Sequence, residues 1–392
     1  HTMSEATCTA PATCSVCGAT EGAAMGHSYE SVVTAPTCTE AGYTTYTCSK
    51  CGDSYTEAGE AALGHASVTY SFANNVHTFT CDVCGQAVLT NKGAQKFGIR
   101  SAAPMLSEDI VLLYKVHMPE GVELGYMTFE FNGETFYVYE YEYEASSDRY
   151  IFRFPGINPQ KMGDNICATV YAYVDGCEVS DTHASYSMVQ YCDSQLKKAT
   201  TSDATRTMLS DLLAYGEAAQ IAQGYKTDVM LTSLLTPGTN LTPSTFPSEL
   251  DESINVMRSS GEKDARVRFK SATLDLGAKV VVRYTVECTD ISLFTYKLEV
   301  SGREYTYTGE DLVPTGTANV YTLDFDKVRA SELGEVITAT VWEGDTQVST
   351  TIEYSVYTYI YRNYNKEGQT EATAKLLKSI YNYGEAVKAS VA

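Results

Sequence analysis

The sequence predicts a mainly β protein in which small cysteine-rich repeats precede two tandem Ig-like β-sandwich domains, each closed by a C-terminal α-helix. Tyrosine (30) far outnumbers tryptophan (1), a composition typical of half-buried sheets. Cys-x-x-Cys-Gly occurs three times near the start, and the remaining chain contains one longer pattern twice. We expect repeats over 1–96, a first sandwich with helix over 97–225, a linker over 226–262 and a second sandwich with helix over 263–392.

The three Cys-x-x-Cys-Gly motifs have the spacing of metal-ligand pairs. The first two motifs each follow an upstream cysteine and precede a Gly-His pair, so sequence order predicts two complete Cys₃His sets. The third copy has no downstream Gly-His, and its fourth ligand is left open between water, a residue from elsewhere, and His65. The predicted ligands are Cys8, Cys14, Cys17 and His27 in the first set, Cys38, Cys48, Cys51 and His65 in the second, and His77, Cys81 and Cys84 in the third.

Four ligands of this kind suit tetrahedral Zn²⁺, and a closed ligand shell indicates a structural ion. The loops vary while the ligand order holds, with five residues between Cys8 and Cys14 but nine between Cys38 and Cys48. A disulfide framework is the competing interpretation, because many cysteines in a short, presumed secreted segment also favour pairing. The recurring Gly-His favours zinc, since disulfides do not explain it. The segment has too few large apolar residues for a core, so metal or disulfides must stabilise it.

Beyond the repeats, two stretches of the chain align with each other. Ser101–Val116 matches Ser271–Val286, and Tyr215–Ala218 matches Tyr383–Ala386. Asn132-Gly133 and Asp175-Gly176 between apolar runs predict β-hairpins, because these residues tolerate positive φ. We therefore expect two copies of one domain, each built of short strands and a single closing helix.

Each closing helix carries one apolar stripe, which predicts that it packs on its own sandwich. In the first helix the N-cap is Ser202 or Asp203, and Gly224 follows the end. Gly216 and Gly384 lie inside the helices at a cost of about 1 kcal/mol each, which indicates close packing against a strand. The breaker-rich stretch 236–247 between the copies predicts an interdomain linker that lies along a surface.

Alternating tyrosines mark a candidate binding surface in the first copy. Phe136 and Val138 match Tyr305 and Tyr307 of the second copy, so their side of the strand is expected to face the core. The tyrosines of the other parity then face outward on one strand face, where they can stack on sugar rings or anchor a partner protein. Ordinary cross-strand pairing, or cover by the closing helix, is the alternative. These tyrosines are Tyr137, Tyr139, Tyr141 and Tyr143.

The net charge and the remaining sequence motifs exclude some classes of function. The net charge of −21 disfavours nucleic acid, and no apolar run long enough for a membrane span or a signal peptide is visible. The first three residues look like a vector remnant. Asp324 and Asp326 share a strand face and are expected to form a solvated acidic edge rather than a cation site. The cysteines outside the repeats are expected to be buried free thiols: Cys167, Cys177, Cys192 and Cys288.

The second repeat, from Ala35 to Tyr55 with its closing Gly64-His65, resembles cysteine-rich repeats of large modular surface and secreted proteins of gut Firmicutes, which are Gram-positive bacteria. The resemblance extends to the helix segments around Tyr215 and Tyr383 and implies an extracellular or cell-surface setting. We expect a non-catalytic protein that adheres to a glycan or to a host or partner protein, with structural zinc. Two alternatives stay open: an accessory carbohydrate-binding region of an extracellular glycoside hydrolase, and a purely structural spacer. Oligomeric state and anchoring mode are not predicted.

Overall fold

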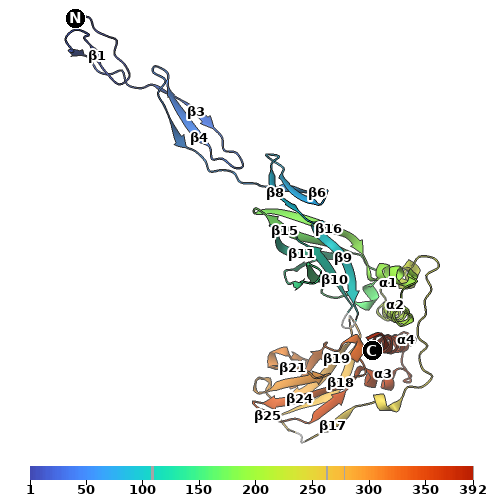
Figure 1. Ribbon diagram of the computed structural model, residues 1–392. Coiled ribbons are helices and arrows are strands. Elements are labelled where there is room, and N and C mark those ends of the chain that lie inside the picture. The colour runs from blue at the N-terminus through green and yellow to red at the C-terminus, as the bar shows by residue number, and fades with distance from the viewer. Residues whose placement is uncertain (107–109, 262–263, 278, 392) are drawn as a thin grey trace. The chain divides into compact units, whose positions relative to one another are not determined.

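The computed structural model describes residues 1–106, 110–261, 264–277 and 279–391 and is mainly β, as predicted (Figure 1). The chain divides into two compact units. One comprises residues 1–98, 117–126 and 170–181, and the other comprises 99–116, 127–169 and 182–392. The first unit contains the cysteine-rich repeats, and the second contains most of both sandwiches with all four α-helices.

The cysteine-rich repeats form short antiparallel ribbons. A two-stranded ribbon comes first, and two three-stranded ribbons follow. Gly18, Gly52 and Gly85 each adopt a φ near +75° directly after the second cysteine of the motif, a conformation that favours glycine. The strands are β1 (Ala12–Thr13), β2 (Thr20–Glu21), β3 (Tyr29–Thr34), β4 (Tyr43–Cys48), β5 (Ser54–Ala58), β6 (Val68–Ala73), β7 (Val76–Cys81) and β8 (Ala87–Lys92).

The first sandwich has two four-stranded sheets, in the orders β13-β14-β10-β9 and β12-β11-β15-β16. Alternation along β15, with every second residue buried, gives the sheet its core face. The strands are β9 (Gly98–Met105), β10 (Val111–His117), β11 (Glu123–Phe131), β12 (Glu134–Val138), β13 (Glu142–Glu144), β14 (Arg149–Arg153), β15 (Ile166–Val174) and β16 (Cys177–Tyr186).

The second sandwich repeats this strand order, with sheets β18-β19-β23-β22 and β17-β26-β24-β20-β21, to which β25 adds at β24. The strands are β17 (Arg258–Ser260), β18 (Val267–Asp275), β19 (Val281–Cys288), β20 (Thr295–Val300), β21 (Arg303–Tyr307), β22 (Val313–Pro314), β23 (Val320–Phe325), β24 (Ile337–Glu343), β25 (Thr346–Gln347) and β26 (Thr351–Tyr354).

The shared topology confirms the Ig-like duplication predicted from sequence. When strands are counted from β9 in the first copy and from β18 in the second, the first, second, sixth and fifth form one sheet and the others form the second sheet, which is the strand partition of Ig-like sandwiches. Tyr114 and Tyr284, which the alignment pairs, are both fully buried. The predicted hairpins are also present, because Asn132-Gly133 and Asp175-Gly176 have positive φ at both residues and connect β11 to β12 and β15 to β16.

Each copy ends in two helices, whereas the sequence predicted one. The additional helices are short: α1 (Met188–Lys197) and α3 (Val356–Asn363) precede the closing helices α2 (Asp203–Gln223) and α4 (Glu371–Val391). Ser187 and Ser355 cap the short helices at equivalent positions, each accepting a backbone N–H bond. These segments were missed because they span only two to three turns and follow directly on a strand. The caps of α2 are as predicted, with Ser202 at its start and Gly224 at φ 63° past its end.

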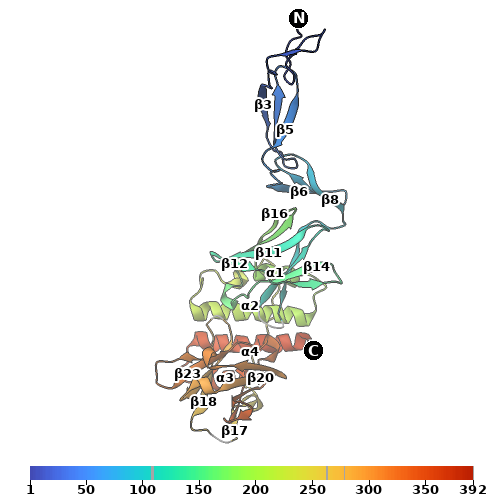
Figure 2. The same ribbon diagram turned by 90° about the vertical axis from the view of Figure 1, so that its left-hand side faces the viewer.

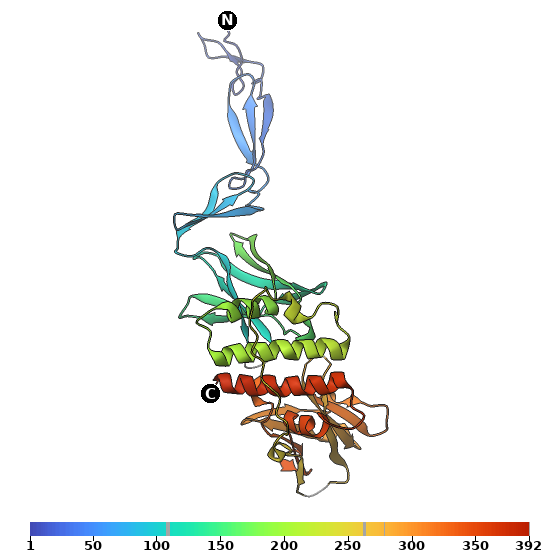
Figure 3. The same ribbon diagram turned by 90° about the vertical axis from the view of Figure 1, so that its right-hand side faces the viewer.

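The closing helices α2 and α4 lie side by side, as Figures 2 and 3 show. Tyr215 stacks on Tyr383, its counterpart in the other copy, at 5.8 Å between ring centroids. Ser390, late in α4, donates a hydrogen bond to the sulfur of Met208, early in α2, so the helices run antiparallel. Each helix therefore packs on the other copy as well as on its own, which the single-stripe prediction did not foresee.

Gly216 and Gly384 are required by close packing, but not against a strand as predicted. A Cβ at Gly216 would lie 2.3 Å from Met162 Cε and 2.9 Å from the Pro159 carbonyl oxygen, in the 3₁₀ turn Pro159–Lys161 and the residue after it. A Cβ at Gly384 would lie 2.6 Å from the Tyr357 hydroxyl of α3. Turns and helices, not strands, occupy these positions.

The stretch between the copies is hydrogen-bonded to helices α1 and α2. Asp193 of α1 accepts hydrogen bonds from the backbone and hydroxyl of Thr236 and from the hydroxyl of Thr239. Asp211 of α2 accepts two more from Ser244. Buried or half-buried carboxylates thus hold an otherwise irregular segment.

Candidate metal centres and the tyrosine surface

The cysteines and histidines of the repeats converge in three groups, and the two four-membered groups contain residues from both sides of a repeat boundary. In each group the candidate ligand atoms lie within 4.8 Å of one another. Group A comprises Cys8, His27, Cys48 and Cys51; group B comprises Cys38, His65, Cys81 and Cys84; group C comprises His1, Cys14 and Cys17.

This grouping corrects the one predicted from sequence order. The upstream cysteine and the Gly-His histidine of one repeat lie beside the Cys-x-x-Cys motif of the next repeat. They do not lie beside the Cys-x-x-Cys motif of their own repeat, which stands between them in the sequence. The third motif, for which His65 was one of three options, therefore gains both His65 and Cys38. Sequence order failed here because residues that are adjacent along the chain end up at opposite ends of a ribbon.

Backbone hydrogen bonds explain why the upstream cysteine and the Gly-His of one repeat meet. The N–H of Gly26 donates to the Cys8 carbonyl, and the N–H of Gly64 donates to the Cys38 carbonyl. Both glycines have a φ near +70°, which turns the next residue, the histidine, toward the cysteine. The first two repeats thus each present a Cys/His pair at one end and a Cys-x-x-Cys pair at the other.

A second backbone contact aligns consecutive repeats. The N–H of Ser49 donates to the Ser28 carbonyl across the first boundary, and the N–H of Asp82 donates to the Ser67 carbonyl across the second. Each donor follows the first cysteine of a motif, and each acceptor follows the histidine of the preceding repeat by one or two residues. The two boundaries therefore have the same construction.

The thiols differ in their ease of ionisation. Burial, together with the neighbouring thiols of Cys51 and Cys48, raises the pKa of Cys8 to about 11. Burial also opposes ionisation of Cys48, but N–H donors at Lys50, Ser28 and Cys51 outweigh it and lower the pKa to about 5. The N–H of Cys84 and the His65 ring likewise lower the pKa of Cys81 to about 6. A negative sulfur is thus stabilised at the first cysteine of these two motifs.

The twelve cysteines are free thiols in the structure. Cys8 and Cys48 lie 3.8 Å apart between sulfurs, well beyond a disulfide bond of about 2 Å. The convergence of three sulfurs and one imidazole is compatible with structural metal binding, since a metal ion uses all four ligands whereas a disulfide would pair only two of them.

His77 lies apart from the three groups. Its side chain is only 1% exposed, and its Nδ1 lies 3.1 Å from the Tyr70 hydroxyl. Burial and then the nearby His117 lower its pKa, which favours the neutral ring. A Cβ at Gly93 would lie 2.4 Å from Nε2, so the glycine makes room for this ring. His77 is a core residue of the third ribbon, and its ligand role was suggested only by its spacing from Cys81.

The third ribbon has an apolar core that the second lacks. Phe79, Phe97, Val122, Ala172, Val174 and Val179 form one buried cluster. Cys177, one of the non-repeat cysteines, is buried here and donates to the His65 carbonyl. In the second ribbon, by contrast, the buried residues between positions 29 and 58 are Cys38, Gly42 and Cys48.

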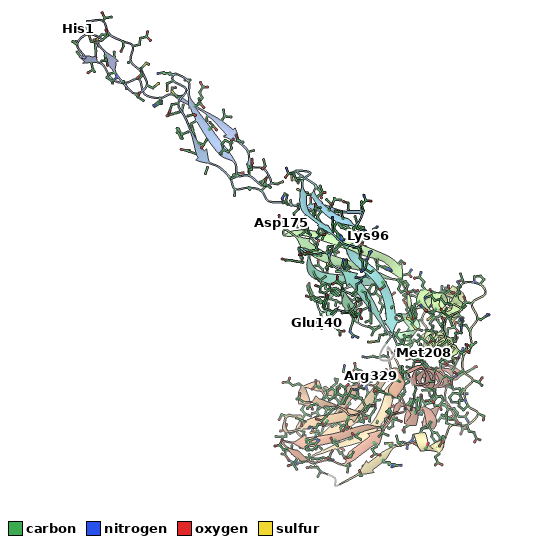
Figure 4. The ribbon with its side chains drawn as sticks, in the orientation of Figure 1. His1, Lys96, Glu140, Asp175, Met208 and Arg329 are labelled. Carbon is green, nitrogen blue, oxygen red and sulfur yellow. The ribbon has the colours of Figure 1, made fainter. Side chains whose placement is uncertain are left out.

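The four candidate tyrosines are exposed, but they do not share one strand face. Strand β12 ends at Val138 and β13, in the other sheet, begins at Glu142, so only Tyr137 and Tyr143 lie in strands. Glu140, labelled in Figure 4, marks the connection between them. Exposed fractions are 60% for Tyr137, 65% for Tyr139, 47% for Tyr141 and 54% for Tyr143. The alternation of tyrosines in the sequence could not predict that the strand is interrupted, because the chain passes from one sheet to the other between β12 and β13.

Two of these rings are held in place by neighbours. Tyr141 and Tyr143 contact Tyr150 at 5.3 and 5.1 Å between ring centroids. The Tyr143 hydroxyl donates to Asp148. Phe136 is half-buried and packs edge-on against Phe154, which confirms that its side of the strand faces the core. We call the four tyrosines the tyrosine surface.

The remaining candidates have structural roles. Asp324 forms two short hydrogen bonds with the Arg283 guanidinium, and Asp326 pairs with Lys279 and Lys327. Cys192 and Cys288 are buried, whereas Cys167 is only half-buried. Within the described ranges, no helix is both long enough and apolar enough to cross a membrane.

Comparisons with known proteins add little. No family model matches the chain, and no curated protein does. Among solved structures, the chain is similar to one described as a Ca²⁺-stabilized adhesin that helps an Antarctic bacterium to reach out and bind ice, at 12% identity and a TM-score of 0.20. The match covers 86% of this chain and 66% of that one, and so spans just under two thirds of it. A likeness this weak carries no argument about fold or function.

Proposed function

We propose that the protein is a non-catalytic extracellular or cell-surface module in which zinc ions at groups A and B join consecutive repeats, while the tyrosine surface binds a glycan. The observation that carries the glycan proposal is the concentration of four exposed tyrosines in one copy of a duplicated domain.

Zinc is supported by the spacing of the ligand atoms. Tetrahedral zinc with Zn–S of about 2.3 Å and Zn–N of about 2.0 Å separates two sulfurs by about 3.8 Å and a sulfur from a nitrogen by about 3.5 Å. Cys8 and Cys48 sulfurs lie 3.8 Å apart, and Cys51 Sγ lies 3.3 Å from His27 Nδ1. In group B, Cys84 Sγ lies 3.9 Å from His65 Nδ1. These separations fit one ion among four ligands.

Four protein ligands leave no position for a substrate, so a zinc ion in group A or B has a structural role. Because the ligands of each group come from consecutive repeats, the ion also joins those repeats. The second ribbon, which buries almost no side chains of its own, then has a metal centre at each end to stabilise it.

The tyrosine surface suits a sugar ligand because tyrosine combines a flat apolar ring with a polar hydroxyl. Contacts with Tyr150 limit the rotation of Tyr141 and Tyr143, so less side-chain entropy is lost on binding. In the second copy the positions matching Tyr137 and Tyr139 are Thr306 and Thr308, both exposed, which provides an internal comparison.

A glycan array tests the proposal with three chains: the natural one, a Tyr139→Ala/Tyr141→Ala variant and a Thr306→Ala/Thr308→Ala control. We expect the natural chain and the control to bind the same glycans and the tyrosine variant to lose most of that binding. Equal binding by all three, or none by any, would remove the tyrosine surface as a glycan site. Absence of binding would leave a protein partner or a structural spacer as the remaining functions.

A further inference from the structure

Group C has the geometry of groups A and B with one ligand fewer. His1 Nδ1 lies 3.4 Å from Cys17 Sγ, which matches the 3.3 Å between His27 Nδ1 and Cys51 Sγ in group A. Cys14 is buried like the first cysteine of the other two motifs, while Cys17 is exposed like the second. Figure 4 labels His1 at this end of the chain.

The backbone around group C repeats the boundary contact of the other groups. The N–H of Ser15 donates to the Thr2 carbonyl, just as the N–H of Ser49 donates to the Ser28 carbonyl. Met3 also forms a β-bridge with Cys14. His1 therefore occupies the place of His27 relative to its motif.

Groups A and B each contain a further cysteine, Cys8 and Cys38, that has no counterpart among the described members of group C. Within the described residues, group C has three members, and two of the three are exposed. A tetrahedral ion held by three protein ligands keeps one coordination position open to an external ligand.

We propose that group C binds a zinc ion through His1, Cys14 and Cys17 and takes a cysteine thiolate from another polypeptide segment as its fourth ligand. The proposal rests on zinc occupying groups A and B. On binding, the incoming thiol loses its proton to solvent, a sulfur–zinc bond forms, and the water at the open position leaves. The site would thereby act as a metal-dependent junction to a segment bearing a suitable cysteine.

Cobalt(II) substitution tests this on the full chain, because its visible spectrum distinguishes thiolate number. We expect three cobalt ions per chain by native mass spectrometry. Adding N-acetylcysteine amide, a model of a peptide cysteine, should add one adduct and raise the sulfur-to-cobalt charge-transfer absorbance of the third ion by about half, as two thiolates become three. N-acetylserine amide is the matched control and should change nothing.

Two variants separate the sites. Cys14→Ser/Cys17→Ser should bind two cobalt ions and show no response to the thiol, while His1→Ala should weaken the third ion by at least about tenfold. Two ions in the natural chain, or a third that ignores the thiol, would overturn the inference and leave the zinc proposal for groups A and B intact. No ions at all would instead overturn that proposal.

Discussion

Cys8 and Cys48 lie 40 residues apart in sequence, yet their sulfur atoms are 3.8 Å apart. The first cysteine belongs to one repeat and the second to the next. Groups A and B each take their members from two consecutive repeats, so an ion bound there, as proposed, would join those repeats.

Paired serine variants test which cysteines share an ion. Cys8→Ser/Cys48→Ser should abolish group A and leave one tight zinc in group B, because both cysteines belong to group A. Cys38→Ser/Cys48→Ser should abolish the zinc ions of both group A and group B, because the two cysteines lie in different groups. Native mass spectrometry of the zinc-loaded chain counts the ions. If the ligand sets instead followed sequence order, Cys8 and Cys48 would belong to different sets and Cys38 and Cys48 to the same set. The first variant would then lose two zinc ions and the second variant only one.

Removing zinc should unfold the second ribbon selectively. Its strands β3 to β5 bury few residues, so metal coordination must supply the folding free energy, on the order of 10 kcal/mol per structural zinc. We expect the amide protons of Tyr43–Cys48 to lose protection from hydrogen exchange when a chelator is added and to recover it with zinc. The amides of Val281–Cys288 in the second sandwich should remain protected. Unchanged protection in the ribbon would contradict a structural metal.

Alanine at Gly216 should destabilise the protein by about 1–3 kcal/mol, although alanine favours helix by about 1 kcal/mol. The added Cβ would lie 2.9 Å from the Pro159 carbonyl oxygen, a backbone atom that cannot move independently. Gly384→Ala is the matched comparison: there the nearest backbone atom, the Ala330 carbonyl oxygen, lies at 3.5 Å, and we expect a smaller loss. Thermal unfolding of both variants measures the difference, and equal losses would count against the role of Pro159.

The carboxylate of Asp193 should make the free energy of unfolding decrease at acidic pH. Burial opposes its ionisation, but Lys197 and hydrogen bonds from Thr236 and Thr239 outweigh it and hold its pKa below the usual range. A carboxyl with a depressed pKa stabilises the folded state above its unfolded pKa of about 3.9, and this contribution is lost as pH falls further. Asp193→Asn should therefore lower stability at pH 7 by about 1–3 kcal/mol and weaken its decline below about pH 4.

Urea unfolding of the natural chain and of the Asp193→Asn variant between pH 3 and 7 gives the two curves. They should converge toward low pH. Parallel curves would show that Asp193 does not hold the linker through its charge.

Local patterns predicted the features that depend on neighbouring residues. Asn132-Gly133 predicted its hairpin, because the required positive φ is a property of those two residues. Ser202 and Gly224 predicted the bounds of α2, because capping involves only nearby backbone groups. The short helix α1 was missed since its ten residues, fewer than three turns, show little periodicity.

The sequence by itself determined that the protein is mainly β, that its sandwich domain is duplicated, and that its repeats carry cysteine and histidine in a metal-ligand pattern. Tertiary structure alone decided which ligands converge: Cys8 meets Cys48 across a repeat boundary, and His77 lies in a core. It also decided that α2 pairs with α4. The physical reason is that strand, turn and cap preferences act over a few residues, whereas a tetrahedral ligand set or a helix interface depends on how whole ribbons and domains lie against one another.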